Sequence, residues 1–126
     1  MKKEELTVGD WVIELKTHKL MFVCEIGVCT LSLKDPNEFG YYYAMYSDVE
    51  PVPLSIEILE KIGFQQRGEY YHITIEDEDT RYCVEYDILS GKLTINNTWF
   101  VMNEVSYVHK LQQLLKLNKI NKPIEL

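Results

Sequence analysis

Hydrophobic and polar positions alternate with a period of two along most of this chain, and that period predicts β-strands. In residues 1–50, short polar turns break the alternation, which predicts four or five short strands in a meander. The strands expected there cover residues 11–16, 20–26, 28–33 and 41–46. A run of short strands joined by tight turns predicts a small SH3-like β-barrel or meander for residues 1–50.

Two details of this meander follow from the spacing of its residues. In the first strand, Trp11 and Ile13 share the apolar face, so Val12 and Glu14 are expected on the opposite, polar face. Gly27 predicts a bulge or bend between the second and third strands.

A module boundary is expected at residues 48–53, where Pro51 and Pro53 stiffen an extended connector. The chain is therefore divided into modules 1–50 and 54–126, with one continuous packed domain left open as the alternative. A helix follows the connector, because Ser55 is a good N-cap and Gly63 lies where a left-handed C-cap residue belongs.

The period returns to two after this helix and predicts a four-strand antiparallel meander. Its strands are expected at residues 69–76, 81–88, 92–96 and 99–102. Tyr71, Ile73 and Ile75 share the apolar face of the first of them. A last helix is expected from an N-cap at Asn103 to about Leu117. The fold class predicted for the whole chain is α+β.

The net charge of −7 is spread unevenly over the 126 residues. The acidic body repels phosphate backbones, so direct nucleic-acid binding is disfavoured. Residues 103–126 carry four lysines against two glutamates, so this basic segment stays open as a local exception.

The chain contains no long apolar run, which predicts no membrane association. Cys24, Cys29 and Cys83 are odd in number, and each lies within an apolar stretch. This pattern predicts buried free thiols and a cytoplasmic location.

The motifs of common active sites are missing from the sequence. His18, His72 and His109 do not have the spacing of metal ligands, and the sequence has no phosphate-binding glycine loop. We therefore predict no catalytic residue, cofactor or metal, and an enzyme with an unrecognised site remains an alternative.

Two groups of residues are candidates for a partner surface. The first is the polar face of the last predicted helix, formed by His109, Gln112, Gln113 and Lys116. That face suits either solvent or a partner. The second is the pair Tyr41 and Tyr43, which alternation places opposite Tyr42 and Tyr46, and it suits either a partner or packing between the modules.

Three short motifs carry a family resemblance. They are Val8-Gly9-Asp10, the stretch from Glu50 through Ser55 to Gly63-Phe64, and the segment from Tyr107 to Leu114. Their order resembles small phage and mobile-element proteins of Bacteroidetes-type bacteria, although Ser55 replaces the usual threonine. The resemblance implies a mobile-element origin and no particular chemistry.

The function expected from these observations is a non-enzymatic module that binds another protein. Besides the unrecognised enzyme, the alternative is a phage accessory protein that associates with nucleic acid or mimics it.

Overall fold

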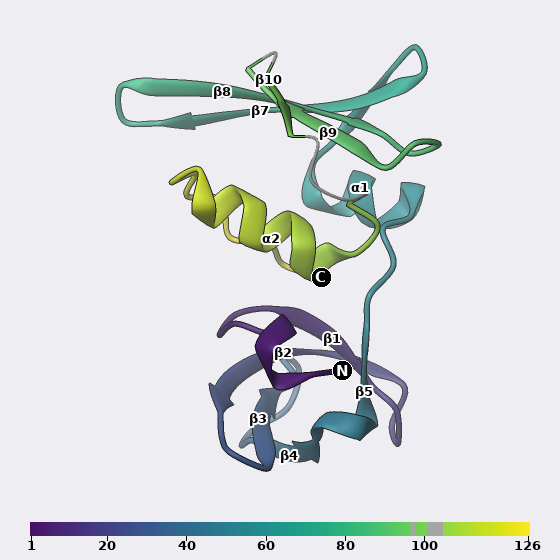
Figure 1. Ribbon diagram of the computed structural model, residues 1–126, viewed down its shortest axis with the longest axis vertical. Coiled ribbons are helices and arrows are strands. Elements are labelled where there is room, and N and C mark those ends of the chain that lie inside the picture. The colour runs from purple at the N-terminus through teal and green to yellow at the C-terminus, as the bar shows by residue number, and fades with distance from the viewer. Residues whose placement is uncertain (97, 101–104) are drawn as a thin grey trace. The chain divides into compact units, whose positions relative to one another are not determined.

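The computed structural model describes residues 1–96 and 105–126, and the backbone of residues 98–100. Over these residues the chain forms ten strands and two α-helices, with the strands in two antiparallel five-stranded sheets (Figure 1). The predicted α+β class is confirmed. The chain divides into two compact units, Met1–Pro53 with Tyr107–His109, and Leu54–Ser106 with Lys110–Leu126.

The first unit contains one sheet with the strand order β4-β3-β2-β1-β5. Its strands are β1 (Trp11–Glu14), β2 (Lys19–Ile26), β3 (Thr30–Lys34), β4 (Tyr42–Met45) and β5 (Val49–Pro51). The meander from β1 to β4 is as predicted. The sheet is open rather than a closed barrel, because its pairings run from β4 at one edge to β5 at the other. Strand β5 lies within the segment that the sequence predicted to be a connector.

The core of the first unit lies on one face of this sheet. Its buried side chains are Leu6, Val12, Met21, Val23, Leu31, Leu33, Ala44 and Val49. The predicted faces of β1 are therefore wrong, because Val12 belongs to the core and Glu14 beside it is also fully buried. Trp11 is buried as well and packs edge-on against its cross-strand partner Phe22, with the ring centroids 5.4 Å apart.

Glu14 is buried because its carboxylate closes the turn between β1 and β2. Its two oxygens accept hydrogen bonds from the backbone N–H groups of Lys16 and Thr17, at 2.6 and 2.9 Å. Burial raises the pKa of the Glu14 carboxyl. These two bonds, together with hydrogen bonds from the Thr17 and Tyr42 side chains, lower the pKa by more than burial raises it. The net pKa lies below the ordinary glutamate value, so the buried group is a carboxylate at neutral pH.

The predicted irregularity near Gly27 is a tight turn, and the bulge lies earlier in β2. Val23 pairs with Leu33 and Glu25 with Ser32, so Cys24 is one extra residue in β2. The N–H of Gly27 donates to the carbonyl of Thr30 at 2.9 Å and closes the turn into β3.

The second unit begins with α1 (Ile56–Ile62), whose two ends are as predicted. The Ser55 hydroxyl accepts a hydrogen bond from the N–H of Ile58 at 3.2 Å. Gly63 ends the helix with φ of 119°, in the left-handed region that favours glycine.

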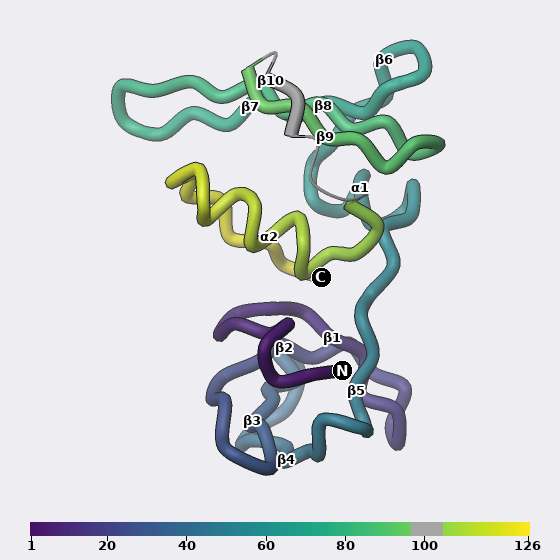
Figure 2. Tube along the Cα trace, in the orientation of Figure 1, coloured from purple at the N-terminus to yellow at the C-terminus, as the bar shows by residue number. Residues whose placement is uncertain are grey.

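Five strands follow α1 along the chain and form one sheet, in which they lie side by side in the order β10-β9-β8-β7-β6. Figure 2 traces the chain through them. They are β6 (Gln65–Arg67), β7 (Tyr70–Asp77), β8 (Thr80–Asp87), β9 (Lys92–Ile95) and β10 (Thr98–Phe100). Strand β6 was not predicted from the sequence. The predicted apolar face of β7 is confirmed, because Tyr71, Ile73 and Ile75 are all buried.

The last helix, α2, spans Val108–Leu117. It begins later than predicted, because residues 105–107 are not helical. The predicted N-cap Asn103 and the end of the predicted strand 99–102 lie outside the described residues.

Candidate functional site

Three side chains form a row across β2, β3 and β4 on the outer surface of the first sheet. Glu25 pairs with Ser32, and Ser32 pairs with Tyr43. Directly paired residues in antiparallel strands project to the same face, with their Cβ atoms about 4.5–5.5 Å apart. Because Leu31 and Leu33 on either side of Ser32 belong to the core, the row faces away from it.

The bulge in β2 adds a fourth side chain to this surface. Cys24 is the extra residue of the bulge, and it lines the same hollow as Glu25. In a regular strand two consecutive side chains would lie on opposite faces. The bulge therefore allows β2 to supply both a thiol and a carboxylate.

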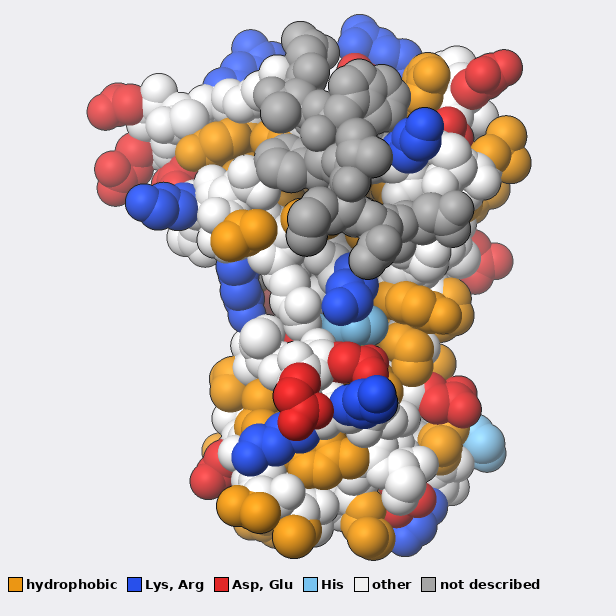
Figure 3. Space-filling view, viewed as in Figure 1, with side chains coloured by type: hydrophobic (Ala, Val, Ile, Leu, Met, Phe, Trp, Pro, Cys, Tyr) orange, Lys and Arg blue, Asp and Glu red, His pale blue; other side chains and the backbone are white. Residues whose placement is uncertain are grey.

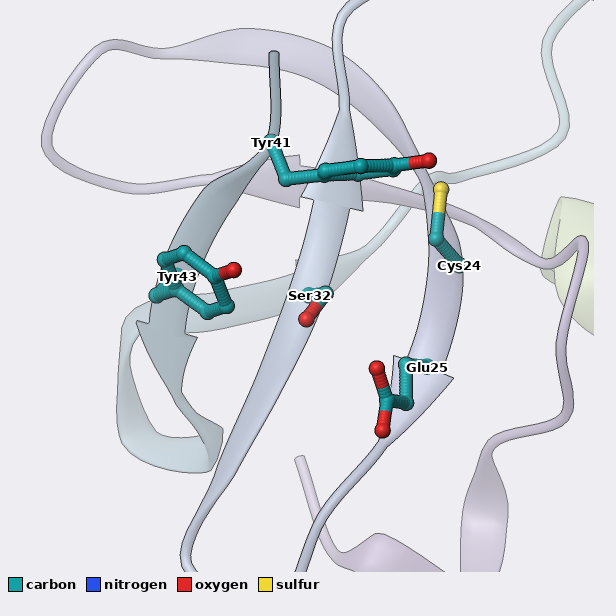
Figure 4. Close-up of a pocket in the computed structure, with 5 residues that line it drawn as sticks. All are labelled: Cys24, Glu25, Ser32, Tyr41 and Tyr43. Atoms are coloured by element: carbon teal, nitrogen blue, oxygen red, sulfur yellow. The ribbon is translucent and has the colours of Figure 1, made fainter.

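Tyr41, just before β4, completes a pocket of about 210 Å³. We call it the tyrosine pocket, and it is lined by Cys24, Glu25, Ser32, Tyr41 and Tyr43. Figure 4 shows the Tyr41 ring extending across β3 toward Cys24 and the Glu25 carboxylate turned toward Ser32. All five residues come from three neighbouring strands of one sheet and the segment that leads into β4.

The tyrosines alternate as the sequence predicted. Tyr41 and Tyr43 are 63% and 70% exposed, whereas Tyr42 and Tyr46 pack against the core of the first unit. Met45, the next outward residue of β4, is 57% exposed. We call the surface formed by Tyr41, Tyr43 and Met45 the tyrosine face.

Glu25 is the one residue of formal charge among the five that line the tyrosine pocket. Burial raises the pKa of the Cys24 thiol, and the positive charge of Lys34 opposes this rise only in part. The Lys34 amine donates to the backbone carbonyls of Asp35 and Glu38. The pocket thus combines two aromatic rings, a protonated thiol, a hydroxyl and a single carboxylate.

The predicted polar face of the last helix is not one solvated surface. His109 and Gln112 are buried, with 1% and 8% of their surface exposed, whereas Lys116 is exposed and Gln113 is half-buried. For Gln112 the reason is helical spacing, since it follows the buried Val108 by four residues and therefore lies on the same face of the helix. The prediction of a solvated face is wrong for these two residues.

The prediction that all three thiols are buried is also wrong. Cys29 and Cys83 are exposed, and Cys24 is half-buried. Cys29 lies in the turn between β2 and β3, and Cys83 faces away from the core beside Thr74. Cys29 therefore lies outside the apolar strands on either side of it. Cys83 lies on the opposite face of β8 from the buried Val84.

Among the residues that the structure describes, no three His, Cys, Asp or Glu side chains group in a way that could hold a metal ion. His18 is exposed in the turn between β1 and β2. His72 lies on β7 and pairs with Gln65 on one side and Glu85 on the other.

A second, smaller hollow of about 160 Å³ lies on the outer face of the second sheet. It is lined by Tyr70, Glu85, Asp87, Lys92 and Thr94. The Ser90 hydroxyl and the backbone N–H of Leu89 donate to Asp87, and these contacts lower the pKa of its carboxyl. The Asp87 carboxylate thus serves to close the turn into β9, and we do not treat this second hollow as a binding site.

The fold and the pocket define an α+β protein with two antiparallel sheets and an exposed aromatic surface on the first. In comparisons with known proteins, the chain matches no family model, no curated protein and no solved structure. Within the described part of the chain, no helix has both the length and the apolar character needed to cross a membrane.

Proposed function

We propose that this chain is a non-enzymatic protein-interaction module and that its partner binds the tyrosine face. The observation that carries the proposal is the exposure of Tyr41 and Tyr43, at 63% and 70%, beside the tyrosine pocket. Tyrosine and methionine are enriched in protein interfaces, and tyrosine is one of the residues that most often dominate binding energy.

The position of these residues on the sheet also favours a protein partner. Strand β4 is at an edge of the first sheet. An edge strand presents backbone N–H and C=O groups that an extended segment of another protein can pair with. The tyrosine face and the backbone of β4 together offer side-chain contacts and main-chain hydrogen bonds to the same segment.

The proposal includes an SH3-like architecture for the first unit. Two features support it: β5 pairs with β1 after a meander of four strands, and the 3-10 turn Tyr46–Asp48 joins β4 to β5. It also includes the mobile-element origin, which rests on the sequence resemblance alone.

Association with nucleic acid is less well supported by the charges. The chain is acidic overall, at −7, and Figure 3 shows basic and acidic side chains interspersed on the face it draws. A protein that binds phosphate backbones concentrates its basic residues on one face. We therefore do not propose nucleic-acid association, and the nuclease treatment in the experiment below distinguishes it from protein binding.

The proposal is tested by photo-crosslinking from the tyrosine face. The variant Tyr43→p-benzoylphenylalanine is irradiated in lysate of a Bacteroidetes-type bacterium, with and without nuclease. The matched control carries the same group at Tyr70, a 42% exposed tyrosine of the second sheet. We expect a protein adduct that is specific to position 43, survives nuclease and disappears when Tyr41→Ser is added.

Adducts shared by positions 43 and 70, or the absence of any adduct, would contradict the proposal. Adducts that appear only when nucleic acid is intact would favour the phage accessory alternative instead. Circular dichroism on each variant confirms that the substitutions leave the fold intact.

A further inference from the structure

The tyrosine pocket has the chemistry of a site for an organic cation. Its walls are two tyrosine rings and its one formal charge is the carboxylate of Glu25. The face of an aromatic ring attracts a cation, and the attraction grows when the cation is partly removed from water. A carboxylate at the same site adds a charge-assisted hydrogen bond to an ammonium or guanidinium group.

The groups around the pocket are consistent with this assignment. The Cys24 thiol, with its raised pKa, adds no negative charge at neutral pH. Lys34 is the cation whose charge acts on this thiol, and its amine donates hydrogen bonds to the carbonyls of Asp35 and Glu38. Glu25 is exposed, and its carboxylate is turned toward Ser32 (Figure 4).

We infer that the partner places one arginine or lysine side chain in the tyrosine pocket, over the outer face of β3. This inference rests on the proposed function and adds the chemistry of the partner. The Glu25 carboxylate comes from β2 and the Tyr43 ring from β4, with Ser32 of β3 between them, so a cation that contacts both lies above Ser32.

The experiment measures the affinity of three short peptides by isothermal titration calorimetry. Each alternates threonine and valine around one central residue, which is arginine, glutamine or glutamate. We expect the arginine peptide to bind about tenfold more tightly than the glutamine peptide, and the glutamate peptide to bind least. This preference should shrink as salt screens the charges.

Two protein variants locate the effect. Glu25→Gln keeps the shape of the side chain and removes its charge, so it should abolish the preference for arginine over glutamine. Glu50→Gln is the matched control, because Glu50 is an exposed glutamate on β5, at the other edge of the same sheet. It should leave the preference unchanged.

Equal affinity for the arginine and glutamine peptides would overturn the inference, as would a preference that persists in Glu25→Gln. Failure of all three peptides to bind at millimolar concentration would also overturn it. The crosslinking experiment is independent of these results. A partner captured at Tyr43 through a segment without arginine or lysine would sustain the proposed function and refute the inference alone.

Discussion

The buried carboxylate of Glu14 offers a sharp test of how the first unit is stabilised. Both of its oxygens are used, one by the N–H of Lys16 and the other by the N–H of Thr17. The substitution Glu14→Gln keeps the size of the side chain but replaces one accepting oxygen with a donating amide nitrogen. One of the two turn N–H groups then faces another donor instead of an acceptor.

The cost follows from these two contacts. A hydrogen bond to a charged group contributes about 1.5–3 kcal/mol, and a donor that is only partly buried, as these two are, costs less than a fully buried donor without an acceptor, for which the cost is about 1–3 kcal/mol. The two terms overlap, so we expect Glu14→Gln to lower the free energy of unfolding by about 2–4 kcal/mol. For a domain of this size that corresponds to a fall in Tm of about 6–12 °C.

The assay is thermal unfolding of both proteins as a function of pH. Because the folded-state pKa of Glu14 lies below its ordinary value of 4.5, the carboxylate stabilises the fold above that value. The contribution is lost as pH falls from about 4.5 through the lower folded-state pKa. The difference in Tm between wild type and Glu14→Gln should therefore be full at neutral pH and narrow in acid.

Two results would refute this reasoning. Equal Tm values at neutral pH would show that the charged contacts contribute nothing, and a difference that does not change with pH would show that its source is not the carboxylate. Glu50→Gln serves again as the control, because the exposed Glu50 should give nearly the wild-type Tm at every pH.

Two further substitutions test local features of the fold. Gly27→Ala should cost about 1–3 kcal/mol in urea unfolding, because its Cβ would lie 2.6 Å from the carbonyl oxygen of Thr30. Val28→Ala, at an 85% exposed position, should change stability by less than about 0.5 kcal/mol, and equal losses in the two variants would contradict the clash. Ser55→Ala should lower stability by about 1 kcal/mol through loss of the N-cap, and Ser55→Asp should retain it. A Ser55→Asp variant as unstable as Ser55→Ala in thermal unfolding would argue against capping.

Features set by neighbouring residues could be predicted from the sequence. The caps Ser55 and Gly63 and the buried face of β7 depend on spacings of a few residues, and they lie where the pattern placed them. The faces of β1 could not be predicted in this way. Both faces of that strand carry apolar residues, and the reason to bury Glu14 appears only once the turn folds back on it.

Strand β6 was missed for a different reason. Its residues Gln65–Arg67 are polar and all exposed, so no hydrophobic alternation marks them. These residues form a strand because they pair with β7 across the turn at Gly68. That pairing depends on β7 as well as on β6, so the residues of β6 alone do not reveal it.

The candidate site was predicted only in part. Tyr41 and Tyr43 were found because alternation along one strand separates them from Tyr42. Glu25 and Ser32 were missed because they meet Tyr43 through pairing between strands. No pattern along the chain fixes that pairing to within one residue.

The bulge in β2 links the charge of the tyrosine pocket to the length of the strand. Val23 and Ile26 both contact the core, yet they are separated by an odd number of positions, which a regular strand would place on opposite faces. If β2 were regular after Val23, Glu25 would be aligned with Leu31 and would point into the core. Removing one residue between Val23 and Ile26 would keep the core in register while taking either the thiol or the carboxylate out of the pocket. Insertions and deletions in β2 could therefore change what this surface binds without altering the core beneath it.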